Sequence, residues 1–443
     1  MSLANRTIDL ASKQVLVAAD GTAAAPSITN DGDTNTGMFF PAADTIAFSE
    51  GGTEALRLTS TGAISVGSSG TNYGSSNQVL TSQGNTSPIW VNAYTGFKNR
   101  IINGDMRIDQ RNAGAAVTVN STANTYSIDR WYGLGQTADG VFALQQNAGS
   151  VTPPVGFTDY LGATVTTADT SIGANQVYRI TQAIEGLNCT DLAWGTANAK
   201  TITLSFWVRS SLTGTFGGNV ANAGFTRAYP YSYTISSANT WEYKTITVAG
   251  DTTGTWLTTN GVGVHLSFVM GMGSNWTGTA NAWNAGLHFA PTGNTNIIAT
   301  NGATFYITGV QLEAGSTATD FERRPFGTEL ALCQRYFQSY GGVSAADNIC
   351  MGASLTSTQC VGFVQLPVSM RTSPSVGFTS VNAVLLDDNG AGVISNSIVT
   401  NVAGTTSVYL SIPSTTTAGL TANRPARMYV NGINARVTWS AEL

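Results

Sequence analysis

The sequence predicts an all-β protein made of several domains and one short helix. Charged residues make up only 10% of the 443 residues, well below the ~25% of ordinary soluble domains. The chain has 49 glycines and is visibly rich in threonine, serine and asparagine, a composition that favours strands and turns. Short runs of alternating apolar and polar residues recur along most of its length, whereas a helical pattern occurs once. A chain of this length holds about two to four domains.

The composition also argues against several kinds of partner. The net charge of −5 disfavours nucleic acid, whose phosphates need clustered lysines and arginines. The sequence has no apolar run of about 18 residues that could span a membrane. Its N-terminus lacks the basic and apolar regions of a secretory signal peptide, so we expect release from the producing cell by lysis. The four cysteines are widely spaced, and we expect free thiols.

Residues 1–92 are predicted to form a fibrous β shaft. Very short strands alternate here with turns such as Glu50-Gly51-Gly52. Strands of this length do not build a core within one chain, so the segment needs partner chains. The stretch NQVLTSQG (77–84), followed by Pro88-Ile89-Trp90, resembles the end of the shaft repeats of bacteriophage tail fibres. This resemblance implies a homotrimer whose N-terminal region attaches to other virion tail proteins.

Residues 93–325 are predicted to form a two-sheet β-sandwich. Alternating runs bounded by turn residues recur through this region, with the number and spacing typical of a sandwich. In residues 201–209, one side of the run consists of the apolar residues Ile202, Leu204, Phe206 and Val208. The other side carries Thr201, Thr203, Ser205, Trp207 and Arg209.

Several motifs of this region are familiar, and their order adds to their specificity. They read NRIINGDMRIDQRN (99–112), IDRW (128–131), QAIEGL (182–187), TLSFWVRS (203–210) and VQLEAGSTATDFERRPFGTELALCQRYF (310–337). Together they resemble a jelly-roll domain of phage tail fibres and virion proteins, which is similar to carbohydrate-binding modules. The resemblance implies a jelly-roll fold, a binding function and a location in the virion, but no particular ligand.

Residues 326–342 are predicted to form a connecting helix, and residues 343–443 a small distal β-sandwich. Thr328 suits the N-cap and Glu329 the first helical turn. A helix this short is unstable alone, so we expect its apolar stripe to dock between the two sandwiches or at the trimer axis. The stripe of this assembly helix consists of Leu330, Cys333, Tyr336 and Phe337.

Two stretches outside the obvious strands combine aromatic and amide side chains, a mixture that suits sugar binding. Aromatic rings stack on the C–H faces of sugars, while amides match the sugar hydroxyls. The candidate glycan-binding residues are Trp276, Trp283, Tyr229, Tyr231, Asn275 and Asn284. The alternative for these aromatic residues is a structural role, either at the sandwich edge or against a neighbouring subunit.

A structural calcium ion is a further candidate, because carbohydrate-binding jelly rolls often hold one between their first and last strands. The resemblance places Asp105 and Glu313 at comparable positions. The alternative is a pair of surface carboxylates, since calcium takes six to eight oxygen ligands. We expect no other cofactor. With His265 and His288 as the only histidines, a Ser-His-Asp site or a histidine-rich zinc site is not expected.

These observations predict a homotrimeric phage tail-fibre protein that is not an enzyme. The expected partner is a bacterial surface glycan, bound non-covalently by several linked sites at once, so that avidity compensates for weak single sites. A second hypothesis is a purely structural virion component, such as a neck, baseplate or connector fibre, without a host ligand. A third is a polysaccharide depolymerase, which the absence of a long β-helical repeat disfavours.

Overall fold

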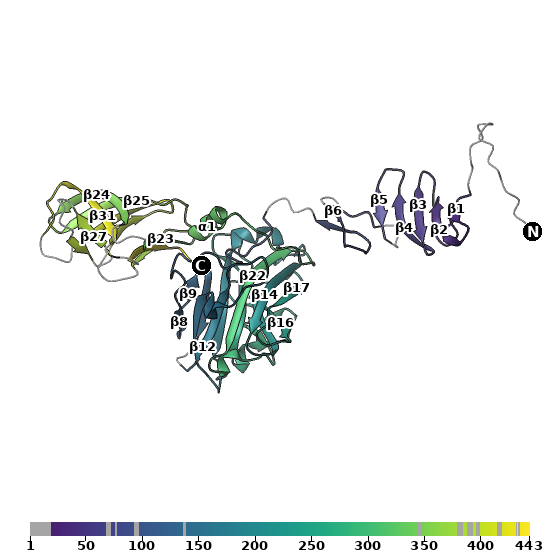
Figure 1. Ribbon diagram of the computed structural model, residues 1–443. Coiled ribbons are helices and arrows are strands. Elements are labelled where there is room, and N and C mark those ends of the chain that lie inside the picture. The colour runs from purple at the N-terminus through teal and green to yellow at the C-terminus, as the bar shows by residue number, and fades with distance from the viewer. Residues whose placement is uncertain are drawn as a thin grey trace, which may run out of the picture. The chain divides into compact units, whose positions relative to one another are not determined.

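The computed structural model describes residues 19–67, 72–75, 78–92, 97–135, 139–342, 347–378, 384–387, 393–395, 399–413, 419–430, 432 and 435–443. Within them the regular secondary structure is almost entirely β-strand, with a single α-helix, which confirms the predicted all-β class (Figure 1). It divides into two compact units, Met1–Phe97 and Lys98–Leu443. None of the described helices is long and apolar enough to cross a lipid bilayer.

The first unit contains a five-stranded antiparallel sheet in which strands follow one another in chain order (Figure 1). Its strands are β1 (Ile28–Asn30), β2 (Asp33–Phe39), β3 (Ile46–Glu50), β4 (Thr53–Leu58) and β5 (Ile64–Val66). A separate hairpin pairs β6 (Gln78–Thr81) with β7 (Ile89–Asn92). The predicted alternation of very short strands and turns in this segment is therefore confirmed.

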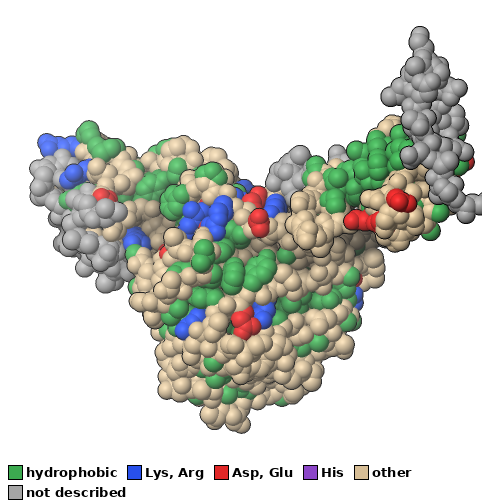
Figure 2. Space-filling view, turned by 45° about the vertical axis from the view of Figure 1, so that its right-hand side comes forward, with side chains coloured by type: hydrophobic (Ala, Val, Ile, Leu, Met, Phe, Trp, Pro, Cys, Tyr) green, Lys and Arg blue, Asp and Glu red, His purple; other side chains and the backbone are tan. Residues whose placement is uncertain are grey.

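One face of the five-stranded sheet is apolar and open to solvent. Residues paired across antiparallel strands point to the same face, and successive pairs here join apolar residues. This open face consists of Ile28, Met38, Ile46, Phe48, Leu56, Leu58 and Ile64. Five of these side chains, those of Ile28, Ile46, Phe48, Leu58 and Ile64, are 38–43% exposed. Figure 2 shows the hydrophobic side chains gathered over this sheet. Apolar patches of this kind mark association surfaces.

The second unit begins with a two-sheet jelly-roll sandwich (Figure 1). In spatial order, the seven-stranded sheet contains β20 (Asn284–Ala285), β16 (Arg227–Ile235), β15 (Gly214–Ala221), β18 (Val262–Met272), β13 (Val177–Glu185), β10 (Trp131–Gly135) and β9 (Thr125–Ile128). The six-stranded sheet contains β17 (Glu242–Val248), β14 (Ile202–Ser210), β22 (Thr304–Ala314), β12 (Leu161–Thr167), β11 (Val141–Gln146) and β8 (Val117–Val119). A small parallel pair joins β19 (Thr277–Gly278) to β21 (Ala290–Pro291).

The core lies between these two sheets. The predicted inward side of β14, represented by Leu204, Phe206 and Val208, is fully buried and belongs to one large apolar cluster with residues such as Phe268 of β18. Short 3-10 turns connect the strands: η2 (Ala148–Ser150), η3 (Gly186–Asn188), η4 (Thr190–Leu192), η5 (Ser274–Trp276) and η6 (Ile297–Ala299).

The connecting helix is shorter than the sequence predicted. Helix α1 spans Phe326–Gln334 and follows an extended Pro325, with no side-chain cap. Thr328 therefore lies inside the first turn and is not the N-cap. Tyr336 follows the helix, and Phe337 begins strand β23 (Phe337–Gly341). Aromatic residues favour strands, and here β23 finds a partner in β32 (Arg436–Ser440). Tertiary pairing therefore ends the helix before residue 342, where the sequence predicted its end.

Apolar contacts nevertheless dock α1 onto the sandwich. Cys333 and the following Tyr336 are buried together with Ile102 and Ile108 from the start of the jelly-roll domain. Partly buried residues packed against this group are Leu330, Leu332 and Leu443. The helix and the final residue of the chain thus share one small core with the jelly roll. The predicted location at a trimer axis stays a prediction.

Buried ion pairs strengthen the same junction. The carboxylate of Glu185, which is 1% exposed, accepts hydrogen bonds of 2.8 and 2.6 Å from the Arg335 guanidinium. The Glu442 carboxylate accepts hydrogen bonds from Arg111 and from the buried Arg130. Buried charges require such partners, so these contacts hold the end of the chain against the jelly-roll domain.

The described part of residues 337–443 forms the second sandwich, which therefore begins a few residues before the predicted boundary at residue 343. Its larger sheet contains, in spatial order, β28 (Val393–Ser395), β27 (Val384–Asp387), β31 (Arg424–Val430), β24 (Asn348–Thr356), β25 (Gln359–Gln365), β30 (Ser407–Pro413) and β29 (Val399–Ala403). The smaller sheet contains β23, β32 and β26 (Ser375–Phe378). Buried side chains such as Leu410, Met428 and Trp439 form its core.

Candidate functional site

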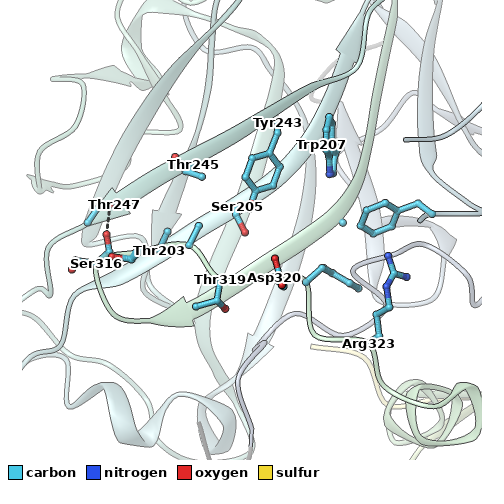
Figure 3. A pocket seen from close by; sticks show the side chains of 15 residues that line it. Thr203, Ser205, Trp207, Tyr243, Thr245, Thr247, Ser316, Thr319, Asp320 and Arg323 are labelled. Atoms are coloured by element: carbon cyan, nitrogen blue, oxygen red, sulfur yellow. Dashed lines mark hydrogen bonds between the residues drawn. The ribbon is translucent and has the colours of Figure 1, made fainter. Parts of the chain in front are cut away.

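A groove of about 1060 Å³ lies on the outward face of the six-stranded sheet, away from the core. Strands β14, β17 and β22 form its floor, and the segment after β22, residues 315–323, forms one wall (Figure 3). Its lining residues are Phe157, Thr203, Ser205, Trp207, Tyr243, Thr245, Thr247, Gly309, Ser316, Thr317, Ala318, Thr319, Asp320, Phe321 and Arg323. This set combines aromatic rings, many hydroxyls and two charges.

The floor follows from the alternation and register of two strands. Cross-strand partners are Thr203 with Thr247, Ser205 with Thr245, and Trp207 with Tyr243. Each pair points to the same face of the sheet, so two hydroxyl pairs lie beside one aromatic pair. The ring centroids of Trp207 and Tyr243 are 5.3 Å apart with an interplanar angle of 50°. Tyr243 is 45% exposed, and its ring is therefore open to a ligand.

A β-bulge in β22 opens the aromatic end of the groove. The register against β14 shifts between Ser205 and Trp207, and Gly309 adopts a φ of 61°. A Cβ atom at Gly309 would lie 2.6 Å from Cζ of Phe157 and 3.3 Å from Cδ1 of Trp207. Glycine is required here both for the left-handed backbone and for the approach of these two rings.

Hydrogen bonds hold the wall against the floor. The buried Glu313 carboxylate accepts bonds of 2.9 Å from the Thr319 amide and 2.7 Å from the Thr319 hydroxyl. The hydroxyl of Thr203 donates to the Gly315 carbonyl at 2.8 Å. The hydroxyl of Thr247 donates to the Ser316 carbonyl at 3.3 Å (Figure 3). The groove is therefore pre-formed, which reduces the entropy lost on ligand binding.

The charged end of the groove carries Asp320 and Arg323 (Figure 3). The Arg323 guanidinium lies 4.7 Å from the ring centroid of Phe157 and 5.7 Å from that of Phe321. These two rings meet edge to face, with centroids 5.3 Å apart. Arg323 thus has two aromatic contacts that orient its side chain.

The side chains of this groove are of the kinds that bind carbohydrates. Sugar rings present C–H faces to aromatic side chains, and the threonine and serine hydroxyls can exchange hydrogen bonds with sugar hydroxyls. Among the described lining residues, Asp320 supplies the single carboxylate, whereas glycoside hydrolysis ordinarily uses two.

The predicted glycan residues do not form this groove. Tyr231 is fully buried in the core and donates from its hydroxyl to the Ser267 carbonyl at 2.7 Å. Tyr229 is also buried and meets the ring of Trp283 at 5.3 Å. Both tyrosines lie on strand β16, and Pro230 within this strand makes it hard to recognise from the sequence. Their assignment as exposed ligand contacts was wrong.

The remaining candidates have local partners. Trp283 belongs to an aromatic cluster with Trp194 and Trp256, at centroid distances of 5.5 Å from each. Its indole donates to the Ala249 carbonyl at 2.7 Å. Trp276 instead packs against Phe289. These contacts fit the alternative prediction, in which the two tryptophans have a structural role at the edge of the sandwich.

The two asparagines also bond within their own surroundings. The Asn284 amide donates to the carbonyls of Thr279 and Ala282, and Asn275 donates to the Asn175 side chain at 2.8 Å. Neither asparagine lines the groove.

Each carboxylate of the predicted calcium pair has a protein partner of its own. The Asp105 carboxylate pairs with Arg107, while Glu313 binds Thr319. Burial raises the pKa of Asp105, and Arg107 opposes this shift. In the described residues no cluster of three or more histidine, cysteine or carboxylate side chains could hold a metal ion.

His265 is buried and its ring stacks on that of Phe225, with centroids 4.5 Å apart. Burial lowers the pKa of His265 to about 3.

The sequence itself carries a signal for the groove. Trp207 occupies the polar side of an alternating run, where a large aromatic side chain has no core to fill. Tyr243 occupies the same kind of position in the run that forms β17. An outward aromatic residue on each of two such strands predicts an exposed stacking surface.

No model of a known protein family matches this sequence, and no curated protein matches it. Among solved structures, the enzymatically active domain of bacteriophage CBA120 tailspike protein 4 aligns over 49% of this chain and 21% of its own, with 12% identity and a TM-score of 0.26. A CBM4 structure aligns over 48% of this chain and 98% of its own, with 17% identity and a TM-score of 0.25. The family 11 carbohydrate-binding module of Clostridium thermocellum, in complex with a β-1,3-1,4-mixed-linked tetrasaccharide, aligns over 46% of this chain and 100% of its own, with 11% identity and a TM-score of 0.24. At these TM-scores, the function has to be argued from the groove itself.

Proposed function

We propose that this protein is a phage tail-fibre protein that binds a bacterial surface glycan in the groove of its jelly-roll domain. The observation that carries the proposal is the pairing of Trp207 and Tyr243 beside a floor of hydroxyls. The paired rings receive the apolar face of one sugar unit. The exposed hydroxyl of Thr245 binds the hydroxyl groups of the next unit.

Binding without cleavage is part of the proposal. The described lining offers the single carboxylate of Asp320 and no histidine. A general acid and a second carboxylate are the ordinary requirements for glycoside hydrolysis, so the groove holds its glycan and does not hydrolyse it.

Self-association of the N-terminal unit would give the protein several grooves. The open apolar face around Ile46, Phe48 and Leu58 loses its contact with water when copies of the chain pack together. Three linked copies would present three grooves to one cell surface, and their avidity would exceed the affinity of each groove. In a virion, the same N-terminal region would join the fibre to other tail proteins.

The test is binding of the full chain to an array of bacterial surface polysaccharides, followed by titration of the polysaccharides that bind. The Trp207→Ala variant should lose about tenfold or more in affinity, because a stacking contact of about 1.5 kcal/mol or more is removed. Trp276→Ala is the matched control, since it removes another partly buried tryptophan of the same sandwich that does not line the groove. It should leave the affinity unchanged.

Three outcomes would contradict the proposal. Equal losses in both variants would mean that the groove is not the binding site. Absence of binding to every polysaccharide would favour a purely structural virion component, and release of reducing ends would favour a depolymerase.

A further inference from the structure

We propose that the groove is selective for acidic polysaccharides, and that Arg323 binds the carboxylate of a uronic acid unit. This inference rests on the proposed glycan-binding function and specifies the class of ligand. It comes from the position of one arginine and from the contacts that orient it.

Arg323 is an exposed arginine that is nevertheless held in place. Its guanidinium lies over Phe157 and Phe321, and the edge-to-face packing of these rings fixes the surface on which it rests. A guanidinium that rests on aromatic rings can still donate hydrogen bonds from its N–H groups. A planar fork of N–H donors matches a carboxylate with two parallel hydrogen bonds.

The charge of Arg323 has no carboxylate within ion-pair distance in the described part of the chain. Neighbouring arginines differ in this respect. Arg324 pairs with Glu322 and Glu329, and Arg107 pairs with Asp105. The Asp105 carboxylate is close enough to feel the charge of Arg323, but its ion pair is with Arg107. Arg323 lines the groove (Figure 3), so the carboxylate of a ligand can pair with it there.

Asp320 gives the acidic ligand an orientation. Its backbone carbonyl accepts hydrogen bonds from Lys98 and Gln311, which fixes its position in the wall. Its carboxylate lines the groove and would accept hydrogen bonds from sugar hydroxyls while repelling a second carboxylate. The acidic unit therefore binds at Arg323, and a neutral part of the ligand lies beside Asp320. A heavily sulfated glycan, which carries several negative charges on each sugar unit, fits this arrangement less well.

The inference can be tested with the full chain and a defined panel of polymers. The acidic probes are alginate, polygalacturonate and hyaluronate, each compared with the same polymer after reduction of its carboxyl groups to alcohols. Dextran and a mixed-linkage β-glucan are the neutral probes, and dextran sulfate tests for unspecific attraction of polyanions. At least one uronic acid polymer should bind, and its reduced form should bind about tenfold or more weakly, because a charge-assisted bidentate contact is lost.

Three variants test whether Arg323 causes the preference for acidic polymers. Arg323→Gln should bind the acidic and the reduced polymer with similar affinity. Arg323→Lys keeps the charge without the fork and should retain a smaller preference. Arg209→Gln is the matched control, because Arg209 also lies over an aromatic ring, that of Tyr306, but does not line the groove. It should behave like the wild type.

The possible failures are distinguishable. Binding of neutral or carboxyl-reduced polymers as tightly as the acidic ones overturns the acidic specificity but leaves the glycan-binding function intact. An acid preference that survives in Arg323→Gln also overturns the assignment to this residue. Dextran sulfate binding that exceeds uronic acid binding points to unspecific polyanion attraction and contradicts the inference. Absence of binding to every polymer of the panel overturns the acidic specificity, whereas the proposed function falls only if the array of bacterial surface polysaccharides also shows no binding.

Discussion

The substitution Gly309→Ala should damage both the stability and the ligand affinity of the jelly-roll domain. A residue with a side chain costs about 1–2 kcal/mol in the left-handed backbone region, and Gly309 has a φ of 61°. The new methyl group would also lie 2.6 Å from Phe157, so this ring must move. Its movement weakens the edge-to-face contact with Phe321, about 0.5–1.5 kcal/mol, and the contact with Arg323, about 0.5–1 kcal/mol. The total expected loss is about 2–4.5 kcal/mol.

The variant Gly302→Ala separates the cost of the left-handed backbone from the cost of the clash with Phe157. Gly302 has a φ of 74°, and no atom lies within 4 Å of a Cβ built there, so only the backbone cost of about 1–2 kcal/mol is expected. Denaturant unfolding followed by tryptophan fluorescence reports mainly on the jelly roll, which carries most of the tryptophans. Gly309→Ala should be the less stable variant and should bind the glycan more weakly. Equal stability of the two variants, with unchanged binding, would refute the role assigned to the bulge.

Three further predictions concern buried groups. Glu442→Ala should cost about 3–5 kcal/mol, because it leaves the buried Arg130 without its carboxylate; urea unfolding measures this, and a loss below 1 kcal/mol would show that the pair is dispensable. Burial raises the pKa of Asp129 from 3.8 to about 6, so the folded state retains a proton that the unfolded state has released, and the contribution of Asp129 to stability should fall by about 3 kcal/mol as the pH rises from about 4 to 6. Asp129→Asn should remove this fall in urea unfolding at stepped pH values, and an unchanged pH dependence would contradict the assignment. Burial raises the pKa of Cys189 to about 12 and that of Cys333 well above its ordinary value; both thiols should resist a disulfide reagent at pH 8, and rapid labelling would show that their surroundings open.

Strand positions could be predicted from the sequence because alternation is a local property. The inward residues Leu204, Phe206 and Val208 follow directly from the period of two, and all three are fully buried. The end of α1 could not be predicted in this way. Pairing of Phe337 with Ser440 takes the chain into a sheet, and that partner lies about a hundred residues away.

The groove could be predicted only in part, because it depends on register and on contacts between distant segments. The outward position of Trp207 was visible in the sequence, but its partner Tyr243 is fixed by strand pairing. The bulge at Gly309 and the bond between Glu313 and Thr319 require the folded sheet. The composition of the loop around Trp283, rich in glycine and asparagine, suggested an exposed side chain. In the structure the Trp283 ring packs against other aromatic rings, which the loop sequence does not show.

A crystal structure of the full chain with an oligosaccharide from the polysaccharide that it binds would test the central claim most directly. We predict a sugar ring facing Trp207 and Tyr243, with the acidic unit within hydrogen-bonding distance of Arg323. An oligosaccharide bound at the cluster of Trp256 and Trp283, with the groove over β14 and β17 empty, would contradict it.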